Sequence, residues 1–162
     1  MPKLIPLTKG LFVIVDDEDF DKMNEFKWHT CTKDRRPYAL RTERFGKRKD
    51  NKKHHIYMHR ILIDAPIGKS VDHINGDSLD NRKENLRLCT TQQNSANSAG
   101  RPNKRKSKYK GVKKNANCST WSARITVNRK EIYLGCFKTE EHAAYAYNKA
   151  AMLYFQEFAR LN

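Results

Sequence analysis

The sequence predicts an α+β fold of small antiparallel sheets and short helices, with a basic linker before the last part. Residues 121–127 alternate between apolar and polar side chains, which is typical of a half-buried strand. From Thr139 onward, apolar residues recur at spacings of three and four, which indicates a helix. Residues 100–108 lack aliphatic and aromatic side chains and include Gly and Pro, as linkers do.

The charge and the apolar content of the chain limit the classes of protein to which it can belong. The chain has 162 residues, with 33 Lys or Arg against 18 Asp or Glu, a net charge of +15. No apolar stretch approaches the roughly 20 residues of a membrane span, and residues 1–6 do not resemble a secretory signal. We therefore expect a soluble cytoplasmic protein with no membrane partner. Basic clusters at residues 44–53 and 101–114 indicate a polyanionic partner.

The four cysteines are far apart in the sequence and form no C-x-x-C pair, which argues against structural zinc. A disulfide framework is not expected in a cytosolic chain. We therefore interpret Cys31, Cys89, Cys118 and Cys136 as reduced packing residues.

Residues 1–53 are predicted to form a β-rich support segment. Residues 11–15 form an apolar, β-rich run, and Asp16 or Asp17 can cap a helix that reaches about Phe26. Residues 28–32 and 38–42 then have the pattern of a hairpin. Four basic side chains of this segment are candidate DNA contacts: Arg41, Arg44, Lys47 and Arg48.

The middle block contains the residues needed to hydrolyse a phosphodiester. That reaction requires a base for water and a hard cation for the phosphate charge. His73 can be the base, while Asp72 and an Asn can give oxygen ligands to magnesium. Adjacent side chains on a strand point apart, but the turn signal Asn75-Gly76-Asp77 predicts that the strand ends there. Residues 86–89 can form the returning strand, and Thr90 or Thr91 can cap a helix that carries Asn94.

This block resembles the HNH nuclease motif with its ββα-metal fold, which we place at residues 54–99. The resemblance implies that His73 is the general base and that Asp72 is a metal ligand. It also implies that Asn85 fixes the loop and orients the base, and that Asn94 completes the metal site. The metal is then Mg²⁺, with Mn²⁺ as a possible substitute, because an amide oxygen suits these ions better than zinc. Three residues are accessory candidates: His59, Arg60 and Arg87. Local packing is an equal interpretation for His59.

The last part, residues 109–162, predicts a three-stranded antiparallel sheet with one helix packed on it. A turn at 128–130 joins strands 121–127 and 131–137, and Trp121 lies on the face that packs against the helix. Thr139 can cap that helix. Its apolar stripe comprises Ala143, Tyr147, Ala150, Ala151, Tyr154 and Phe158. The other face of the sheet is exposed and polar.

This part resembles the DNA-binding domain of plant ethylene-response factors, through residues 109–112, 121–125, 133–137 and 143–147. Family DNA contacts, carried over, fall on Lys110, Lys113, Arg124, Thr126 and Tyr133. Glu131 stands where the family often has a basic residue, so we expect a different sequence preference. The basic linker, residues 100–108, would track the DNA backbone through Lys104, Arg105, Lys106 and Lys108.

Together these features predict a sequence-specific DNA endonuclease of the homing type that needs a divalent metal. It would act as a monomer on double-stranded DNA and leave 3′-hydroxyl and 5′-phosphate ends. A phage or mobile element in a bacterial host would encode it. The alternative is a DNA-binding regulator on an inactive HNH fold. An RNA-binding protein is less favoured, because the exposed sheet face offers only Tyr133 for stacking.

Overall fold

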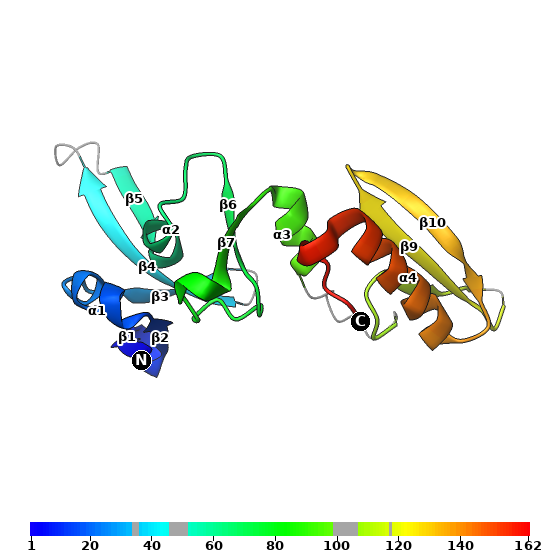
Figure 1. The fold of residues 1–162 in the computed structure, drawn as a ribbon, viewed down its shortest axis with the longest axis horizontal. Coiled ribbons are helices and arrows are strands. Elements are labelled where there is room, and N and C mark those ends of the chain that lie inside the picture. The colour runs from blue at the N-terminus through cyan, green and yellow to red at the C-terminus, as the bar shows by residue number, and fades with distance from the viewer. Residues whose placement is uncertain (34–35, 46–51, 99–106, 117) are drawn as a thin grey trace. The chain divides into compact units, whose positions relative to one another are not determined.

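A computed structural model describes residues 1–33, 36–45, 52–98, 107–116 and 118–162 (Figure 1). The chain forms two compact units, Met1–Cys89 and Thr90–Asn162. The predicted domain boundaries at 53/54 and 99/100 remain predictions, and the first of them falls inside a strand described below. Linker residues 100–106, with Lys104, Arg105 and Lys106, lie outside the described residues, as do Lys47 and Arg48.

The first unit begins with a two-stranded antiparallel sheet. β1 (Lys3–Pro6) pairs with β2 (Phe12–Val15), and the 3-10 turn η1 (Thr8–Gly10) joins them. Helix α1 (Asp17–Asn24) follows directly, with acidic residues throughout its first turn, where they favour the positive end of the helix dipole. The predicted strand and helix are thus confirmed, while β1 is not among the predicted strands.

A three-stranded antiparallel meander comes next, in the order β3 (His29–Lys33), β4 (Arg36–Phe45) and β5 (Lys52–Tyr57). The hairpin expected across residues 33–37 is its first half. The pairing of β4 with β5 extends the sheet past residue 53. Helix α2 (Met58–Leu62) follows β5 without a loop and buries Met58, His59 and Leu62.

The last two strands of this unit form a second antiparallel pair, β6 (Ser70–His73) and β7 (Leu86–Cys89). Residues 74–85 connect them and include the 3-10 turn η2 (Lys83–Asn85). The predicted end of the first strand at His73 and the predicted returning strand are both confirmed.

The elements of the first unit share one apolar core. Its members come from both ends of the unit and include Ile5, Val13, Met58, Val71 and Leu86, all at most 8% exposed. The predicted support segment and the predicted nuclease strands therefore share one hydrophobic core and do not pack as two separate domains.

The second unit starts with helix α3 (Thr91–Asn97) and continues with a sheet in the order β10-β9-β8. The strands are β8 (Val112–Lys114), β9 (Trp121–Val127) and β10 (Lys130–Phe137). Helix α4 (Glu140–Phe155) lies across one face of this sheet (Figure 1), and η3 (Gln156–Phe158) ends the helical run. Thr139 caps α4 by accepting a hydrogen bond from the His142 amide, as predicted.

Close packing under α4 depends on one glycine. Gly111 has φ +73°, and a Cβ there would lie 2.1 Å from the Tyr147 ring. Any larger residue would therefore push the helix off the start of β8.

Two sequence predictions are corrected by these features. The predicted buried stripe of α4 includes Tyr154, but this residue is 44% exposed while Phe155 is buried. The reason is that the helix ends at Phe155 and Gln156 takes a positive φ of 49°, which changes the direction of the chain. Packing roles are expected for all four thiols, yet Cys118 and Cys136 are exposed. No described helix is both long and apolar enough to cross a bilayer.

Candidate nuclease site

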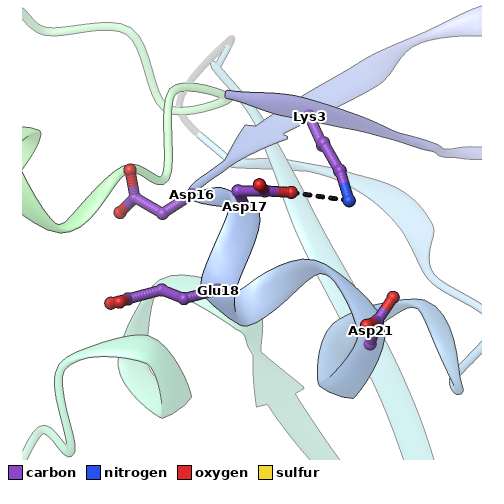
Figure 2. A pocket seen from close by; sticks show the side chains of 5 residues that line it. All are labelled: Lys3, Asp16, Asp17, Glu18 and Asp21. Carbon is purple, nitrogen blue, oxygen red and sulfur yellow. Dashed lines mark ion pairs between the residues drawn. The ribbon is translucent and has the colours of Figure 1, made fainter. Parts of the chain in front are cut away.

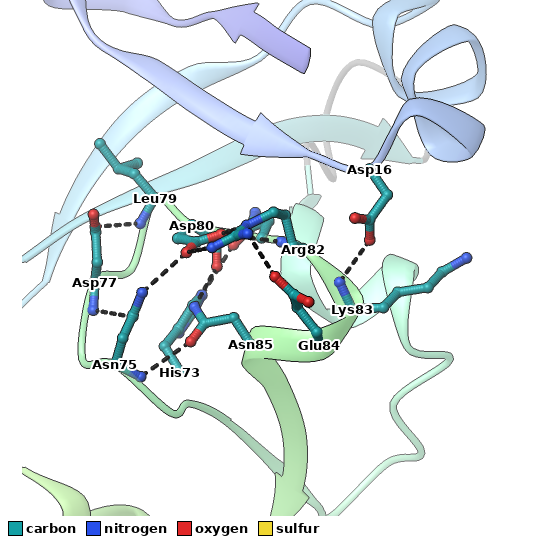
Figure 3. Close-up of polar contacts among 11 residues, drawn as sticks. Asp16, His73, Asn75, Asp77, Leu79, Asp80, Arg82, Lys83, Glu84 and Asn85 are labelled. Atoms are coloured by element: carbon teal, nitrogen blue, oxygen red, sulfur yellow. Dashed lines mark hydrogen bonds and ion pairs between the residues drawn. The ribbon is translucent and has the colours of Figure 1, made fainter. Parts of the chain in front are cut away.

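The site is organised by the connection between β6 and β7. Immediately after His73 the chain turns through Gly76, whose amide donates to the His73 carbonyl at 2.9 Å. The Asn75 carboxamide oxygen accepts from the Asp77 amide, and the Asp77 carboxylate accepts from the Leu79 amide. These side chains satisfy backbone donors that no strand partner reaches, so the turn keeps a defined shape (Figure 3).

Asn85 ties the two ends of this connection together. Its Oδ1 accepts from the Asn75 amide at 3.0 Å, and its Nδ2 donates to the Asp80 carbonyl at 2.7 Å. Its own carbonyl accepts from the Ile74 amide. Asn85 is 6% exposed, so these bonds are shielded from water. The contacts fit the loop-fixing part of the role predicted for Asn85.

An ion pair closes the far side of the loop. Arg82 donates through Nε and Nη2 to the two carboxylate oxygens of Asp80, both at 2.8 Å, and Asn75 Nδ2 adds a bond of 2.9 Å (Figure 3). The Arg82 hydrogen bonds hold the pKa of Asp80 below its usual value. The buried Asp80 carboxylate is therefore charged and fully occupied by structural partners.

His73 is buried, with 7% of its surface exposed, and its Nε2 lies 2.9 Å from Asn81 Oδ1. Burial lowers the pKa of His73 below its ordinary value, although the Asn81 bond and the nearby carboxylates of Asp72, Asp77 and Asp80 oppose this shift. A histidine with a lowered pKa is neutral at pH 7 and has one nitrogen able to accept a proton. This is the state required of a general base.

Aromatic rings hold the His73 ring in place. The His59 ring meets it edge to face, with centroids 5.2 Å apart, and the Tyr38 ring lies at 6.2 Å. Burial lowers the pKa of His59 to about 3, helped by His73 and Arg60. His59 also packs against Tyr57 at 5.5 Å. A neutral, buried ring of this kind favours the packing interpretation of His59 over a phosphate contact.

Asp72 lies one residue before His73 on β6 and is 4% exposed. It is opposite Arg87 in the β6–β7 register, and Arg87 Nε and Nη2 approach Asp72 Oδ2 at 2.9 and 2.8 Å. The accessory candidate Arg87 is thus a direct partner of the predicted metal ligand. Arg60, the other arginine candidate, donates instead to three backbone carbonyls, those of Lys69, Ala65 and Pro66.

Asn94, the second predicted metal ligand, lies on α3 in the other unit. The Thr90 hydroxyl accepts from the Gln93 amide and Gln93 accepts from the Thr90 amide, so a capping box starts this helix at the first of the two threonines predicted as caps. Among the described residues no group of three His, Cys, Asp or Glu side chains is placed to hold a metal. The predicted donors are a carboxylate and an amide oxygen, a set that fits Mg²⁺ or Mn²⁺.

The exposed face of the β8–β10 sheet carries four of the predicted DNA contacts. Lys113, Arg124, Thr126 and Tyr133 are all exposed there, with Arg124 directly opposite Tyr133 in the register. Arg124 Nη1 pairs with Glu131 at 2.5 Å, and its guanidinium lies 5.7 Å from the Tyr133 ring centroid. Lys108, near the start of the unit, is exposed with its ammonium 4.9 Å from the Tyr109 ring centroid.

Lys110 is placed differently from the other predicted DNA contacts. Its Nζ donates to the carbonyls of Ser95, Ala96 and Ser98, at 3.1, 2.6 and 2.8 Å, at the end of α3. Burial, with Arg160 nearby, lowers its pKa to about 8. At pH 7 the ammonium has three donors for these three acceptors, so its hydrogen bonds hold a helix end rather than leaving it open to phosphate.

An acidic depression lies elsewhere on the first unit. It is lined by Lys3 of β1, by Asp16 just before α1, and by Asp17, Glu18 and Asp21 of α1 (Figure 2). Lys3 pairs with Asp17 at 2.6 Å, and this bond lowers the pKa of Asp17. Its excess of carboxylates repels a phosphate backbone, which disfavours DNA binding on this side of the unit.

The direct partner of His73 is missed by sequence reasoning. Asn81 lies within the motif, but the family resemblance assigns the base-orienting role to Asn85. A signal is present in the three consecutive residues Asp80, Asn81 and Arg82, since a polar run of this kind inside a loop is expected to satisfy loop backbone. Which of the two asparagines reaches the imidazole depends on the loop path, and no periodicity encodes that path.

Two comparisons with known proteins place the chain in a family. A family model for HNH endonucleases matches residues 64–96, the segment that contains Asp72, His73, Asn85 and Asn94. An uncharacterised HNH endonuclease of Acanthamoeba polyphaga mimivirus is 31% identical over 156 residues, which cover 95% of this chain and 76% of the relative. The chain therefore belongs to the HNH endonuclease family. Members of this family are nucleases that generally act on DNA and use a divalent metal.

Proposed function

We propose that this protein is a sequence-specific, divalent-metal-dependent DNA endonuclease of the homing type. The observation that carries the proposal is the buried, neutral His73, held at the end of β6 beside Asp72 by a loop whose polar side chains are mutually bonded. Hydrolysis would leave 3′-hydroxyl and 5′-phosphate ends. A monomer acting in a bacterial cytoplasm on behalf of a phage or mobile element is part of the same proposal.

In this mechanism His73 takes a proton from the attacking water through the ring nitrogen that does not face Asn81. Asp72 and Asn94 are the proposed oxygen ligands of Mg²⁺, for which Mn²⁺ could substitute. The metal, when bound, neutralises charge on the phosphate and on the departing 3′ oxygen. Asn85 maintains the loop that holds His73. The rings of His59 and Tyr38 exclude water from the side of the His73 ring against which they pack.

We further propose that the second unit recognises DNA in the manner of the ethylene-response-factor domain. The sheet face with Lys113, Arg124, Thr126 and Tyr133 is exposed, antiparallel and basic, and a two-stranded ribbon fits the major groove. Lys108 and the linker residues Lys104, Arg105 and Lys106 would bind the backbone. Linking two weak DNA contacts raises affinity through effective concentration.

The test is cleavage of supercoiled plasmid by the full chain with Mg²⁺, with excess chelator, and after His73→Ala. Nicked or linear product is expected only with Mg²⁺, and His73→Ala is expected to lower the rate at least about 100-fold. His142→Ala is the matched control, because this exposed imidazole lies on α4 of the second unit and is not among the proposed site residues. Cleavage that persists in chelator or in His73→Ala contradicts the mechanism, and tight DNA binding without cleavage supports the regulator instead.

A further inference from the structure

Asn81 is the most enclosed polar side chain of the first unit, with 1% of its surface exposed. Its backbone amide donates to the Ile14 carbonyl on β2 at 2.8 Å, and the Ile14 amide donates to the Leu79 carbonyl at 2.8 Å. Two backbone bonds therefore fasten this part of the loop to a core strand. The position of the Asn81 side chain is set by the fold and not by a mobile loop.

The bond between Asn81 and His73 has a definite direction. A carboxamide oxygen only accepts hydrogen bonds, so the proton between Asn81 Oδ1 and His73 Nε2, 2.9 Å apart, belongs to the imidazole. A neutral imidazole has a single N–H. Nε2 therefore carries the proton, and Nδ1 keeps the lone pair that can accept one.

We propose that Asn81 is the positioning residue for the general base, fixing both the Nε2–H tautomer and the ring orientation of His73. The inference rests on the proposed nuclease function and deepens it. It transfers the orienting part of the role expected for Asn85 to a residue to which the family resemblance assigns no role. Both polar atoms of the Asn85 carboxamide are bonded to the loop backbone, at Asn75 and Asp80.

The surroundings of Asn81 support a functional reason for an amide at this position. Its Nδ2 is buried and has no hydrogen-bond partner within the described part of the chain. An orphaned buried donor costs free energy, which offsets part of what the bond to His73 contributes to stability. An uncharged acceptor also favours the protonated imidazole less than a carboxylate at the same place would.

The direct test is nitrogen NMR of the metal-free full chain with ¹⁵N-labelled histidine at pH 7. The His73 resonances are identified by their loss in His73→Gln. In the wild type we expect Nε2 to have the shift of a protonated nitrogen and Nδ1 that of an unprotonated one. Asn81→Leu is expected to lose this single-tautomer pattern, and Asn81→Asp, which keeps the acceptor, is expected to keep Nε2 protonated. Asn24→Leu, a change of an exposed asparagine at the end of α1, is the matched control.

Kinetics supply the second readout. Asn81→Leu is expected to lower kcat for plasmid cleavage about 100-fold, the contribution of a well-placed general base. Its Kd for DNA, measured in chelator, should stay within about twofold of wild type, because a buried side chain makes no DNA contact. A change confined to Kd would contradict a positioning role.

The outcomes separate this inference from the nuclease proposal. A wild-type spectrum with the proton on Nδ1 overturns the inference, as does an Asn81→Leu protein with unchanged tautomer and unchanged kcat. If the wild type fails to cleave DNA, the nuclease proposal fails while the spectrum still decides the tautomer. If Asn81→Leu does not fold, the wild-type and Asn81→Asp spectra decide between the two tautomers.

Discussion

The guanidinium of Arg87 holds the carboxylate of Asp72 through Nε and Nη2, at 2.9 and 2.8 Å from the same oxygen. Both side chains are largely buried, with side-chain exposures of 17% and 5%. A cation already stands beside the proposed metal ligand, supplied by the opposite strand. The pair fixes the orientation of the Asp72 carboxylate.

Removing the Arg87 guanidinium should destabilise the protein more without Mg²⁺ than with it. Arg87→Met leaves a buried carboxylate without its cation, which we expect to lower the free energy of unfolding by about 3 kcal/mol. Mg²⁺ should recover part of this loss, because the ion then supplies the missing positive charge. Urea titrations with and without Mg²⁺ measure the difference. An equal loss in both conditions would argue against Asp72 as a metal ligand, and Arg129→Met, an exposed arginine, serves as the control.

Acid should destabilise the first unit through the buried imidazole of His59. The pKa of His59 is about 3 in the folded chain against an ordinary value of 6.5, so the unfolded state binds more protons between these two pH values. The contribution of neutral His59 to the free energy of unfolding is therefore fully present above about pH 6.5. It is lost as the pH falls toward 3, by up to about 4 kcal/mol. Urea midpoints from pH 7 to pH 4 should fall less steeply for His59→Phe than for wild type. His142→Ala should retain the full decline; a parallel decline in His59→Phe would assign the acid sensitivity to other groups.

Lys110 and Lys113 should respond oppositely to removal of their charge. Lys110→Met removes the ammonium donor from three carbonyls at the end of α3, which we expect to cost about 2 kcal/mol of stability. The salt dependence of DNA binding should be unchanged by it. Lys113→Met should leave stability alone and reduce the slope of log K against log salt by about one. Reversed results would return Lys110 to the set of phosphate contacts.

Glu131 should tune the DNA recognition of Arg124. Its carboxylate pairs with Arg124 at an exposed position, where an ion pair adds little stability, and neutralises a charge that would otherwise favour any phosphate. Glu131→Gln should tighten binding to unrelated DNA and lower the ratio of specific to non-specific affinity. Fluorescence anisotropy on a selected site and on a scrambled duplex measures this ratio. Glu141→Gln on α4 is the control, and a uniform change on both duplexes would show that Arg124 reads no base.

Elements whose signal is local can be predicted from the sequence. The alternation in β9, the capping threonines of α3 and α4, and the strand end at His73 each depend on residues a few positions apart. Short strands without alternation, such as β1 and β5, carry no such signal. They are strands because a partner pairs with them and a shared core covers them, not because of intrinsic preference.

The site residues also differ in whether the sequence near them identifies them. His73 and Asp72 stand out by their chemistry and their position before a turn. Their partners Asn81 and Arg87 are 8 and 15 residues away, and the amide of Lys83 donates to Asp16 across 67 residues. Contacts over such separations depend on the complete path of the chain. Lys110 shows the same effect, because its neighbours in the sequence do not tell a lysine that bonds the carbonyls of a helix end from one that binds phosphate.

The backbone bond from Asn81 to Ile14 makes the proposed position of the His73 ring depend on the amino-terminal strands. A fragment reduced to the motif would lack the backbone that anchors the partner of the imidazole, and more than half of the apolar core with it. Anyone transplanting this cleavage module into another protein should therefore start the graft at β1. Variation in the first fifteen residues then becomes a means of adjusting turnover from outside the motif.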